Sequence, residues 1–178
     1  MKITSICFLL LFISCSQNQL KSGYPDCILQ PDRQTDSYGC ANIFVYQFLD
    51  STRALTVTID ADELKLTEKC QTFSLENYFD VISVNLEISG GDPDSIYFNY
   101  CNDVVEPNMG TPDVYHGEIG LLTLSVSEDD PIKDPILETF YRVTIKIEDL
   151  HLFDQNSDEA MIINQVIFWD VGVGWLPG

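Results

Sequence analysis

Three side chains near the C-terminal end of the chain have the spacing of a calcium loop. Asp154, Asn156 and Asp158 offer oxygen atoms at alternate positions, and Ca²⁺ is bound by carboxylate and amide oxygens. The pattern fails further on, because Glu159 stands where the sharp-turn glycine belongs and Gln165 where a glutamate would complete the shell. We interpret the segment as a polar hairpin turn, with calcium at these three residues as the alternative and no other cofactor expected.

The two histidines offer the only other pattern for acid–base chemistry. His116 and Glu118 are two residues apart on an expected strand, as are Asp149 and His151, so each carboxylate could orient an imidazole. A chance neighbourhood on a strand surface is the interpretation we favour. The sequence contains no G-x-S-x-G, no H-E-x-x-H and no phosphate-binding glycine loop. We therefore assign no catalytic residue and expect no enzyme.

Two alternative functions to a non-catalytic protein are considered, one based on aromatic side chains and the other on carboxylates. Exposed rings can stack on sugars, and the candidates for such a platform are Tyr97, Tyr100, Trp169 and Trp175. We expect Trp169 in the core, since its strand is apolar. A calcium-assisted adhesion or glycan-binding module is thus one alternative. A hydrolase is the other, because 28 acidic residues bring some pair together in any fold.

The N-terminal residues predict export. Lys2 precedes the apolar run Ile6 to Ile13, and the small residue Ser14 and then Cys15 follow it. This run is too short to cross a bilayer, since a membrane-spanning helix needs about 20 apolar residues. We interpret residues 1–14 as a signal peptide.

The end of this segment, Leu11-Phe12-Ile13-Ser14-Cys15, resembles the lipobox of bacterial lipoproteins. The resemblance is confined to the N-terminal segment and departs from the family at Phe12, where leucine is usual. It implies cleavage before Cys15 and attachment of lipid, such as palmitate, to that residue. Residues 15–25 would then be a lipidated flexible tether. Because Ser16 is not an aspartate, the family's sorting rule favours the outer membrane of the cell envelope.

The cysteines that remain in the mature chain are expected to pair. Cys7 leaves with the signal peptide and Cys15 carries lipid, so the cysteines left for the domain are Cys27, Cys40, Cys70 and Cys101. An even number in an oxidising compartment predicts two disulfides, with three connectivities that spacing alone does not distinguish. A zinc site is the alternative, although the chain has no C-x-x-C and only two histidines.

Charge restricts the class of partner. The chain has 28 acidic and 9 basic residues, for a formal net charge of −19. Nucleic-acid binding requires a basic surface that releases counterions, so we exclude it. An acidic surface does not adsorb to anionic headgroups either, so contact with the membrane should come only through the lipid on Cys15. The sequence does not identify a protein or glycan partner.

Hydrophobic periodicity predicts an all-β domain over residues 26–178. Apolar and polar residues alternate in Ile82 to Ile88 and in Tyr141 to Glu148, as in strands with one buried face. We count about eight strands, no amphipathic helix and a bulge at Gly120. Ala41 to Leu49 is apolar enough to be a strand covered on both faces, and Asp50 to Arg53 should form the turn after it. Ile96 to Cys101 should be the return strand of a hairpin with Ile82 to Ile88. The expected architecture is an antiparallel β-sandwich, Ig-like or jelly-roll-like, with a β-barrel as the alternative. We expect a lipid-anchored envelope protein whose domain binds a partner or serves a structural role without catalysis.

Overall fold

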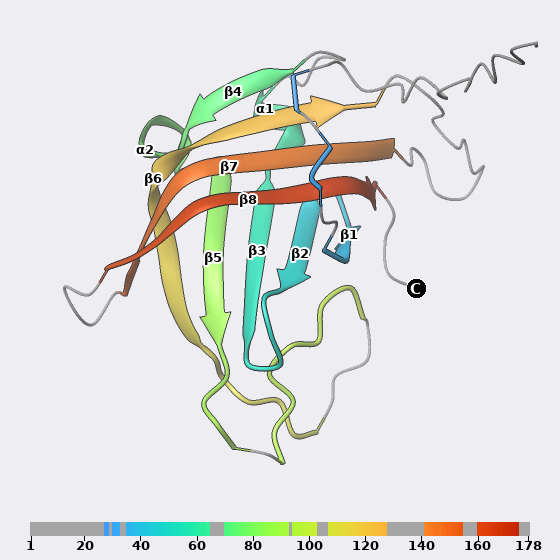
Figure 1. Cartoon of the computed structure of the whole chain (residues 1–178). Helices are drawn as coiled ribbons and strands as arrows, with labels where there is room; N and C mark the ends of the chain where they lie inside the picture. Colours follow the sequence, from blue (N-terminus) through green and yellow to red (C-terminus); the bar gives the residue numbers. More distant parts are fainter. Residues whose placement is uncertain are drawn as a thin grey trace, which may run out of the picture.

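The fold is an antiparallel β-structure with two single-turn helices, seen in a computed structural model (Figure 1). The structure describes residues 27–28, 30–32, 35–64, 70–92, 94–102, 107–127, 141–154 and 160–174. The segments predicted to be a signal peptide and a tether lie outside these ranges, as do Cys15, Asn156, Asp158 and Trp175. The elements are β1 (Ser37–Cys40), β2 (Phe44–Phe48), β3 (Arg53–Ile59), α1 (Ala61–Leu64), β4 (Gln71–Ser74), α2 (Leu75–Tyr78), β5 (Ile82–Ile88), β6 (Asp113–Val126), β7 (Tyr141–Asp154) and β8 (Ala160–Val173).

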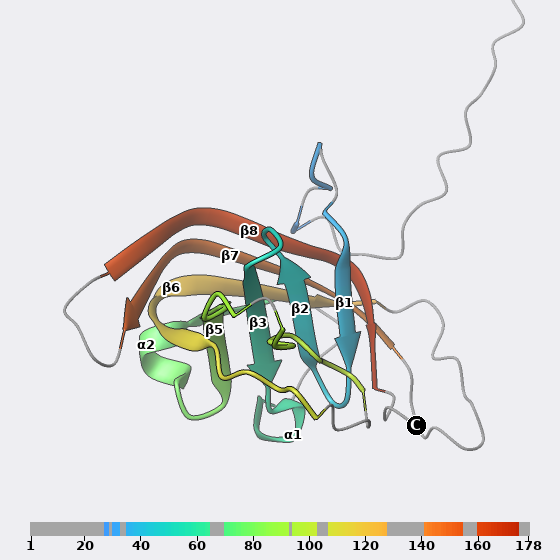
Figure 2. The same cartoon turned by 90° about the horizontal axis from the view of Figure 1, so that it is seen from below.

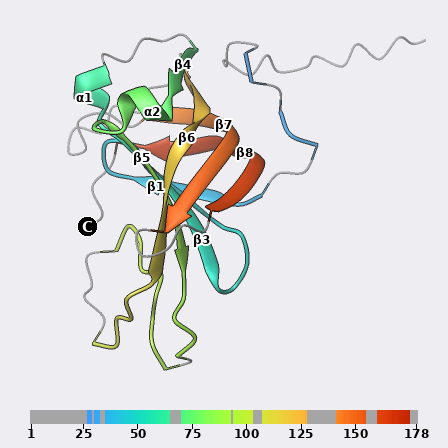
Figure 3. The same ribbon diagram turned by 90° about the vertical axis from the view of Figure 1, so that its left-hand side faces the viewer.

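All eight strands belong to one sheet in the order β1-β2-β3-β5-β6-β7-β8, with β4 paired to β6 beside this path. The first half of β6 pairs with β5 and its second half with β4, so β6 passes from one layer to the other. Figures 1 and 3 show β6, β7 and β8 crossing steeply over β2, β3 and β5. The all-β class with about eight antiparallel strands is therefore confirmed. The sheet curls into a nearly closed barrel whose two halves pack face to face, and this fits the barrel alternative.

Bulges let the long strands bend over the core. The pairing of β6 with β7 shifts register between Gly117 and Ile119 and again between Ile119 and Leu121. Gly120 lies in the second shift with φ +152°, a conformation that glycine alone adopts readily, which confirms the expected bulge. Asp149 in β7 and Asp170 in β8 also have positive φ. In Figure 2 the three strands arch over the other layer.

The core lies between the two layers and follows the alternation of the sequence. In β5, Ile82, Val84 and Leu86 are buried while Ser83 is exposed, as expected. The facing layer contributes buried side chains such as Ile147 and Phe168 to the same cluster. Burial of this apolar surface is the main stabilising contribution to the fold.

Close packing joins the two ends of the sheet where the barrel closes. A Cβ atom on Gly39 of β1 would lie 2.8 Å from Val171 Cγ1 and 2.9 Å from Val173 Cγ1, so only glycine lets β1 approach the end of β8 this closely. The amide of Gly174 also donates a hydrogen bond to the carbonyl of Ala41 at 2.6 Å. Contact between β1 and β8 thus closes the barrel at one end of β8.

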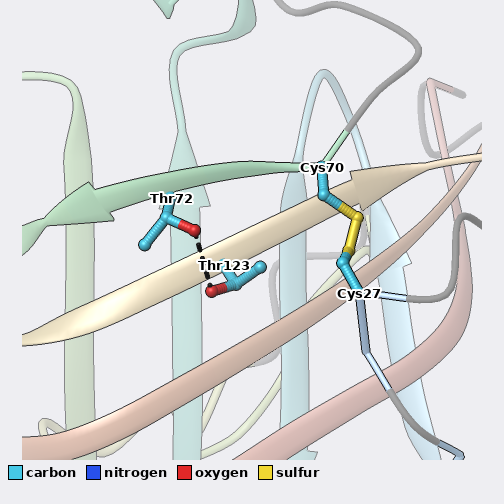
Figure 4. The surroundings of a disulfide bond; sticks show 4 residues. All are labelled: Cys27, Cys70, Thr72 and Thr123. Carbon is cyan, nitrogen blue, oxygen red and sulfur yellow. Dashed lines mark hydrogen bonds between the residues drawn. A yellow bond between two sulfur atoms is a disulfide. The ribbon is translucent and has the colours of Figure 1, made fainter.

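Two disulfides tie loops to this barrel, as the cysteine count predicts. Cys27 pairs with Cys70 next to the start of β4, where Thr72 and Thr123 bridge β4 and β6 through their hydroxyl groups (Figure 4). Cys40 pairs with Cys101 over a Cα–Cα distance of 5.8 Å. The second bond fastens the end of β1 to the loop after β5.

One local prediction is wrong. The alternation of Ile96 to Cys101 suggested a return strand in a hairpin with β5, but β5 pairs instead with β3 and β6. Residues 96–101 form a loop, in which Ile96 makes an isolated bridge to Met109. The Tyr97 ring occupies the space beside Gly90 and Gly110, where a Cβ on Gly110 would lie 2.5 Å from Tyr97 Cε1. Tertiary packing of aromatic rings therefore overrides the local strand pattern.

Candidate functional site

A cleft of about 540 Å³ lies where the barrel does not close. Its walls come from the first half of β8 and from the facing ends of β2, β3 and β5, with Pro31 and Thr35 of the N-terminal segment added. In Figure 1 the back layer continues past β8 on the side away from β7. The residues of β8 that contribute are Met161, Ile162, Ile163, Gln165, Val166 and Ile167, and those opposite are Gln47, Leu49, Arg53 and Leu86. Most of these side chains are apolar, as in ligand clefts generally.

The edge of β8 beside this cleft is unpaired among the described residues. β8 is the last strand of the sheet and pairs only with β7, and its contact with β1 involves its C-terminal end. The half of β8 from Ala160 to Ile167 contains no charged residue and no proline, although 21% of the chain is charged. Proteins usually protect such an edge with lysine, proline or a bulge. The backbone N–H and C=O groups along this edge are therefore accessible for further pairing.

Gln47 is the buried polar side chain of the cleft. Its exposed fraction is 5%, and Ser37 Oγ donates a hydrogen bond to its Oε1 at 3.2 Å. The side chain lines the cleft with its Oε1 already bound, and its Nε2 is the N–H donor of the same amide. An amide N–H on the wall of a cleft is a donor suited to an incoming carbonyl.

A rigid turn forms one rim of the cleft. Asp50 Oδ1 accepts hydrogen bonds from the amide and the hydroxyl of Thr52, both at 2.8 Å, and Asp50 Oδ2 lies 2.6 Å from the Arg53 guanidinium. The bond from Arg53, then those from Thr52, lower the pKa of Asp50 to about 2. The turn expected at residues 50–53 is confirmed, and its one cation is neutralised within the turn.

The surface formed by the described residues is strongly acidic. Its three basic residues are all ion-paired, as Arg53 with Asp50, Arg142 with Asp170 and Lys146 with Glu148. The whole chain has a formal net charge of −19, so the remaining carboxylates are not balanced by cations. A field of this kind attracts cationic ligands and repels anionic ones.

A second cleft, of about 480 Å³, contains one of the two histidine pairs. His116 Nδ1 lies 2.8 Å from Asn85 Oδ1 across the β5–β6 pairing, and Asn85 Nδ2 donates to Ser83 Oγ at 3.2 Å. Glu118 lines the same cleft, but the partner that orients the imidazole is Asn85. Sequence reasoning missed Asn85, although it lies on the polar face of the alternating strand. In the described structure no hydrogen bond joins Asp149 and His151, the other pair, and Asp149 occupies a bulge with positive φ.

Aromatic rings cover the outer face of β2. We call this group the aromatic face, and it consists of Tyr38, Phe44, Tyr46, Phe48, Phe98 and Tyr100. The Tyr46 and Tyr100 rings lie 4.7 Å apart, and Tyr38 stacks on Tyr46 at 5.4 Å. The rings of β2 lie on this one face, and Val45 and Gln47 on the other face are buried, so the expectation of a strand covered on both faces is confirmed. Tyr38 and Phe48 are the exposed members, with 47% and 43% of their surfaces accessible.

Of the aromatics that the sequence singles out, three are described, and of these Tyr100 belongs to this face. Its hydroxyl donates to Glu87 Oε2 at 2.7 Å, and burial followed by this bond raises the pKa of Tyr100. The Tyr97 hydroxyl accepts the Asp92 amide at 3.3 Å and organises the loop. Trp169 is half-buried on β8 and is not part of the core cluster, so its expected place in the core is wrong, and the neighbouring Phe168 is the buried ring of this strand. Tyr38 and Phe48 were missed because each is an ordinary strand residue in sequence.

The calcium candidates are not brought together by the described structure. Asp154 ends β7, whereas Asn156 and Asp158 lie outside the described residues. Within the described ranges, no group of three histidine, cysteine, aspartate or glutamate side chains is arranged to hold a metal ion. The calcium alternative therefore stays a prediction.

Comparison of the chain with family models, curated proteins and solved structures found no match. Among the described residues, no helix has the length and apolar character needed to cross a bilayer.

Proposed function

We propose that this chain is a lipid-anchored protein of the cell envelope, in which a tethered β-domain binds a partner without catalysis. The observation that carries the binding role is the cleft beside the unpaired edge of β8, with its apolar walls and one largely buried glutamine side chain. The lipobox-like segment ending at Cys15 supports the anchor and the outer membrane.

The anchor is tested by metabolic labelling with a fatty acid. We expect label on the wild-type chain and none on Cys15→Ala, because lipid transfer requires that thiol. A chain that still carries label after the substitution would contradict the anchor. Protease treatment of intact cells then reports whether the domain faces outward, since only an exposed domain is digested.

The cleft is tested with a neutral solvatochromic dye such as Nile red, which acidic surfaces do not repel. We expect one equivalent to bind, and Leu49→Asp to weaken binding about tenfold because it places a charge at the apolar rim. Leu121→Asp is the matched control, since Leu121 is an equally exposed leucine, 45% against 37%, on the outer face of β6. Equal loss in both variants, or no binding by the wild type, would contradict a binding cleft.

Glycan recognition is the second candidate, and the aromatic face favours it. Tyr38 and Phe48 expose ring surface beside the half-buried Tyr100, as a sugar platform requires. We expect Tyr38→Ala to abolish retention on a glycan array, with Tyr78→Ala as the control at an exposed tyrosine outside the aromatic face. Retention that both variants share would exclude the platform.

A further inference from the structure

We propose that the partner is an extended, basic polypeptide segment that adds to the sheet as a new strand along the free edge of β8. This inference rests on the proposed binding role of the cleft and specifies its occupant. Strand addition uses main-chain hydrogen bonds for affinity and pockets for alternate side chains for specificity.

The first step is the geometry of the edge. The cleft includes inward-facing Ile163 and Val166 of β8 and also outward-facing Ile162 and Gln165, so it follows the edge on both sides. An extended chain placed beside β8 would continue the layer formed by β6, β7 and β8 and cover the exposed part of the opposite layer. Because side chains alternate along a strand, every second side chain of the added segment would face the opposite wall of the cleft, which includes Leu86.

The second step is the backbone chemistry. A strand without a partner leaves alternate N–H and C=O groups to water, and an added strand satisfies them. Gln47 lines the facing wall of the cleft, and its amide N–H can donate to an incoming carbonyl. The cleft is thus suited to an extended backbone.

The third step is charge. Among the described residues that line the cleft, the only cation is Arg53, which is paired with Asp50. Glu148 lies opposite Gln165 on the outer face beside the edge. With a net charge of −19, the protein attracts a basic segment and repels an acidic one. The same charge opposes pairing of this edge with a second copy of the chain.

The probe is a blocked peptide of alternating lysine and valine, about seven residues long to match a typical strand. Two control peptides are used: one with glutamate in place of lysine, and one with alternate backbone amides N-methylated, which removes pairing donors without changing charge. We expect the full-length protein to bind the lysine peptide and to bind both controls at least about tenfold more weakly. Binding should weaken as salt is raised.

Hydrogen exchange locates the contact. We expect slower exchange at alternate amides of Ala160 to Ile167 and no change in β4, which is another strand with an unpaired edge among the described residues. Ile162→Lys, at a side chain that is 61% exposed, should weaken binding about tenfold because a lysine on the edge repels the basic strand. Ile119→Lys, on the inner strand β6, is the control and should bind nearly as the wild type does.

Three results would overturn the inference. They are equal affinity for the N-methylated peptide, equal affinity for the glutamate peptide, or protection of the β8 amides by self-association without peptide. Dye binding without peptide binding would refute strand addition and leave the cleft as a binding site. Absence of both would refute the cleft as well.

Discussion

At the scale of single residues, Ser125 is a buried polar side chain that has not found a partner. Its exposed fraction is 1%, and its Oγ makes no hydrogen bond among the described residues. The neighbouring Thr144 Oγ1 instead accepts the amide of Asp170 at 3.1 Å. An unsatisfied hydroxyl in a core costs free energy that an apolar group of similar shape does not.

We therefore expect Ser125→Ala to raise the free energy of unfolding by about 1 kcal/mol. Thr123→Ala is the control two residues away, where the hydroxyl lies 3.2 Å from Thr72 Oγ1, and it should be neutral or destabilising by up to about 1 kcal/mol. Urea unfolding measures both. A clear loss of stability in Ser125→Ala would show that its hydroxyl has a partner, such as a buried water.

Tyr141 links the stability of the fold to alkaline pH. Its hydroxyl donates to the carbonyl of Asn42 at 2.8 Å, and burial, followed by repulsion from Asp62, raises its pKa to about 12 from 10.0. Because the folded pKa is raised, the contribution of Tyr141 is fully present below pH 10 and is lost as pH rises toward 12.

We expect the wild type to exceed Tyr141→Phe in stability by about 1 kcal/mol below pH 10, and this difference to shrink above it. Urea unfolding of both proteins at pH 8, 9, 10 and 11 measures the difference, with a short incubation to limit disulfide exchange. A difference that stays constant through this range would contradict the raised pKa.

At the scale of elements, the sequence predicted what depends on local pattern. The alternation of Ile82 to Ile88 gave β5, the turn residues 50–53 gave the β2–β3 connection, and Gly120 marked a bulge. The loop at residues 96–101 was mistaken for a strand because its aromatic residues pack on β2, and no local period records such a contact. The cleft beside β8 was missed for the same reason.

Gly120 shows how one residue determines the bend of β6. At φ +152° any side chain is strained, and a Cβ would lie 3.3 Å from both the Glu148 carbonyl and Leu75 Cδ1. We expect Gly120→Ala to lower the free energy of unfolding by about 2–4 kcal/mol, since backbone strain and crowding add.

Gly91→Ala separates these two contributions. Gly91 also has positive φ, +79°, but a Cβ there meets nothing within 4 Å, so the loss should be only about 1 kcal/mol. Thermal or urea unfolding compares the two variants. Equal losses would show that crowding at the bulge contributes nothing.

At the scale of the whole molecule, closure of the barrel could not be predicted from sequence. β1 and β8 come from opposite ends of the described chain and pack together through Gly39 and the C-terminal end of β8. Hydrophobic period fixes which face of a strand is buried but not which strand it meets, so sandwich and barrel share one pattern. The cleft follows from incomplete closure and was equally hidden.

The net charge of the whole chain follows directly from the sequence, and its effect on stability can be tested with salt. A formal charge of −19 destabilises the compact state through self-repulsion, which salt screens. We expect NaCl at about 0.3 M to raise Tm by about 3–6 °C, or roughly 1–2 kcal/mol for a domain of this size. A fall in Tm would contradict self-repulsion.

Calcium is distinguished from screening by comparing CaCl₂ with MgCl₂ at matched ionic strength. Screening raises Tm equally in both, whereas a specific site adds a calcium-dependent increment that follows ligand concentration. Asp154→Asn would remove that increment if the site includes Asp154, the one calcium candidate among the described residues. Asp149→Asn is the control for loss of a carboxylate on the same strand, because Asp149 is exposed and outside the candidate loop. An increment that survives Asp154→Asn would place calcium elsewhere.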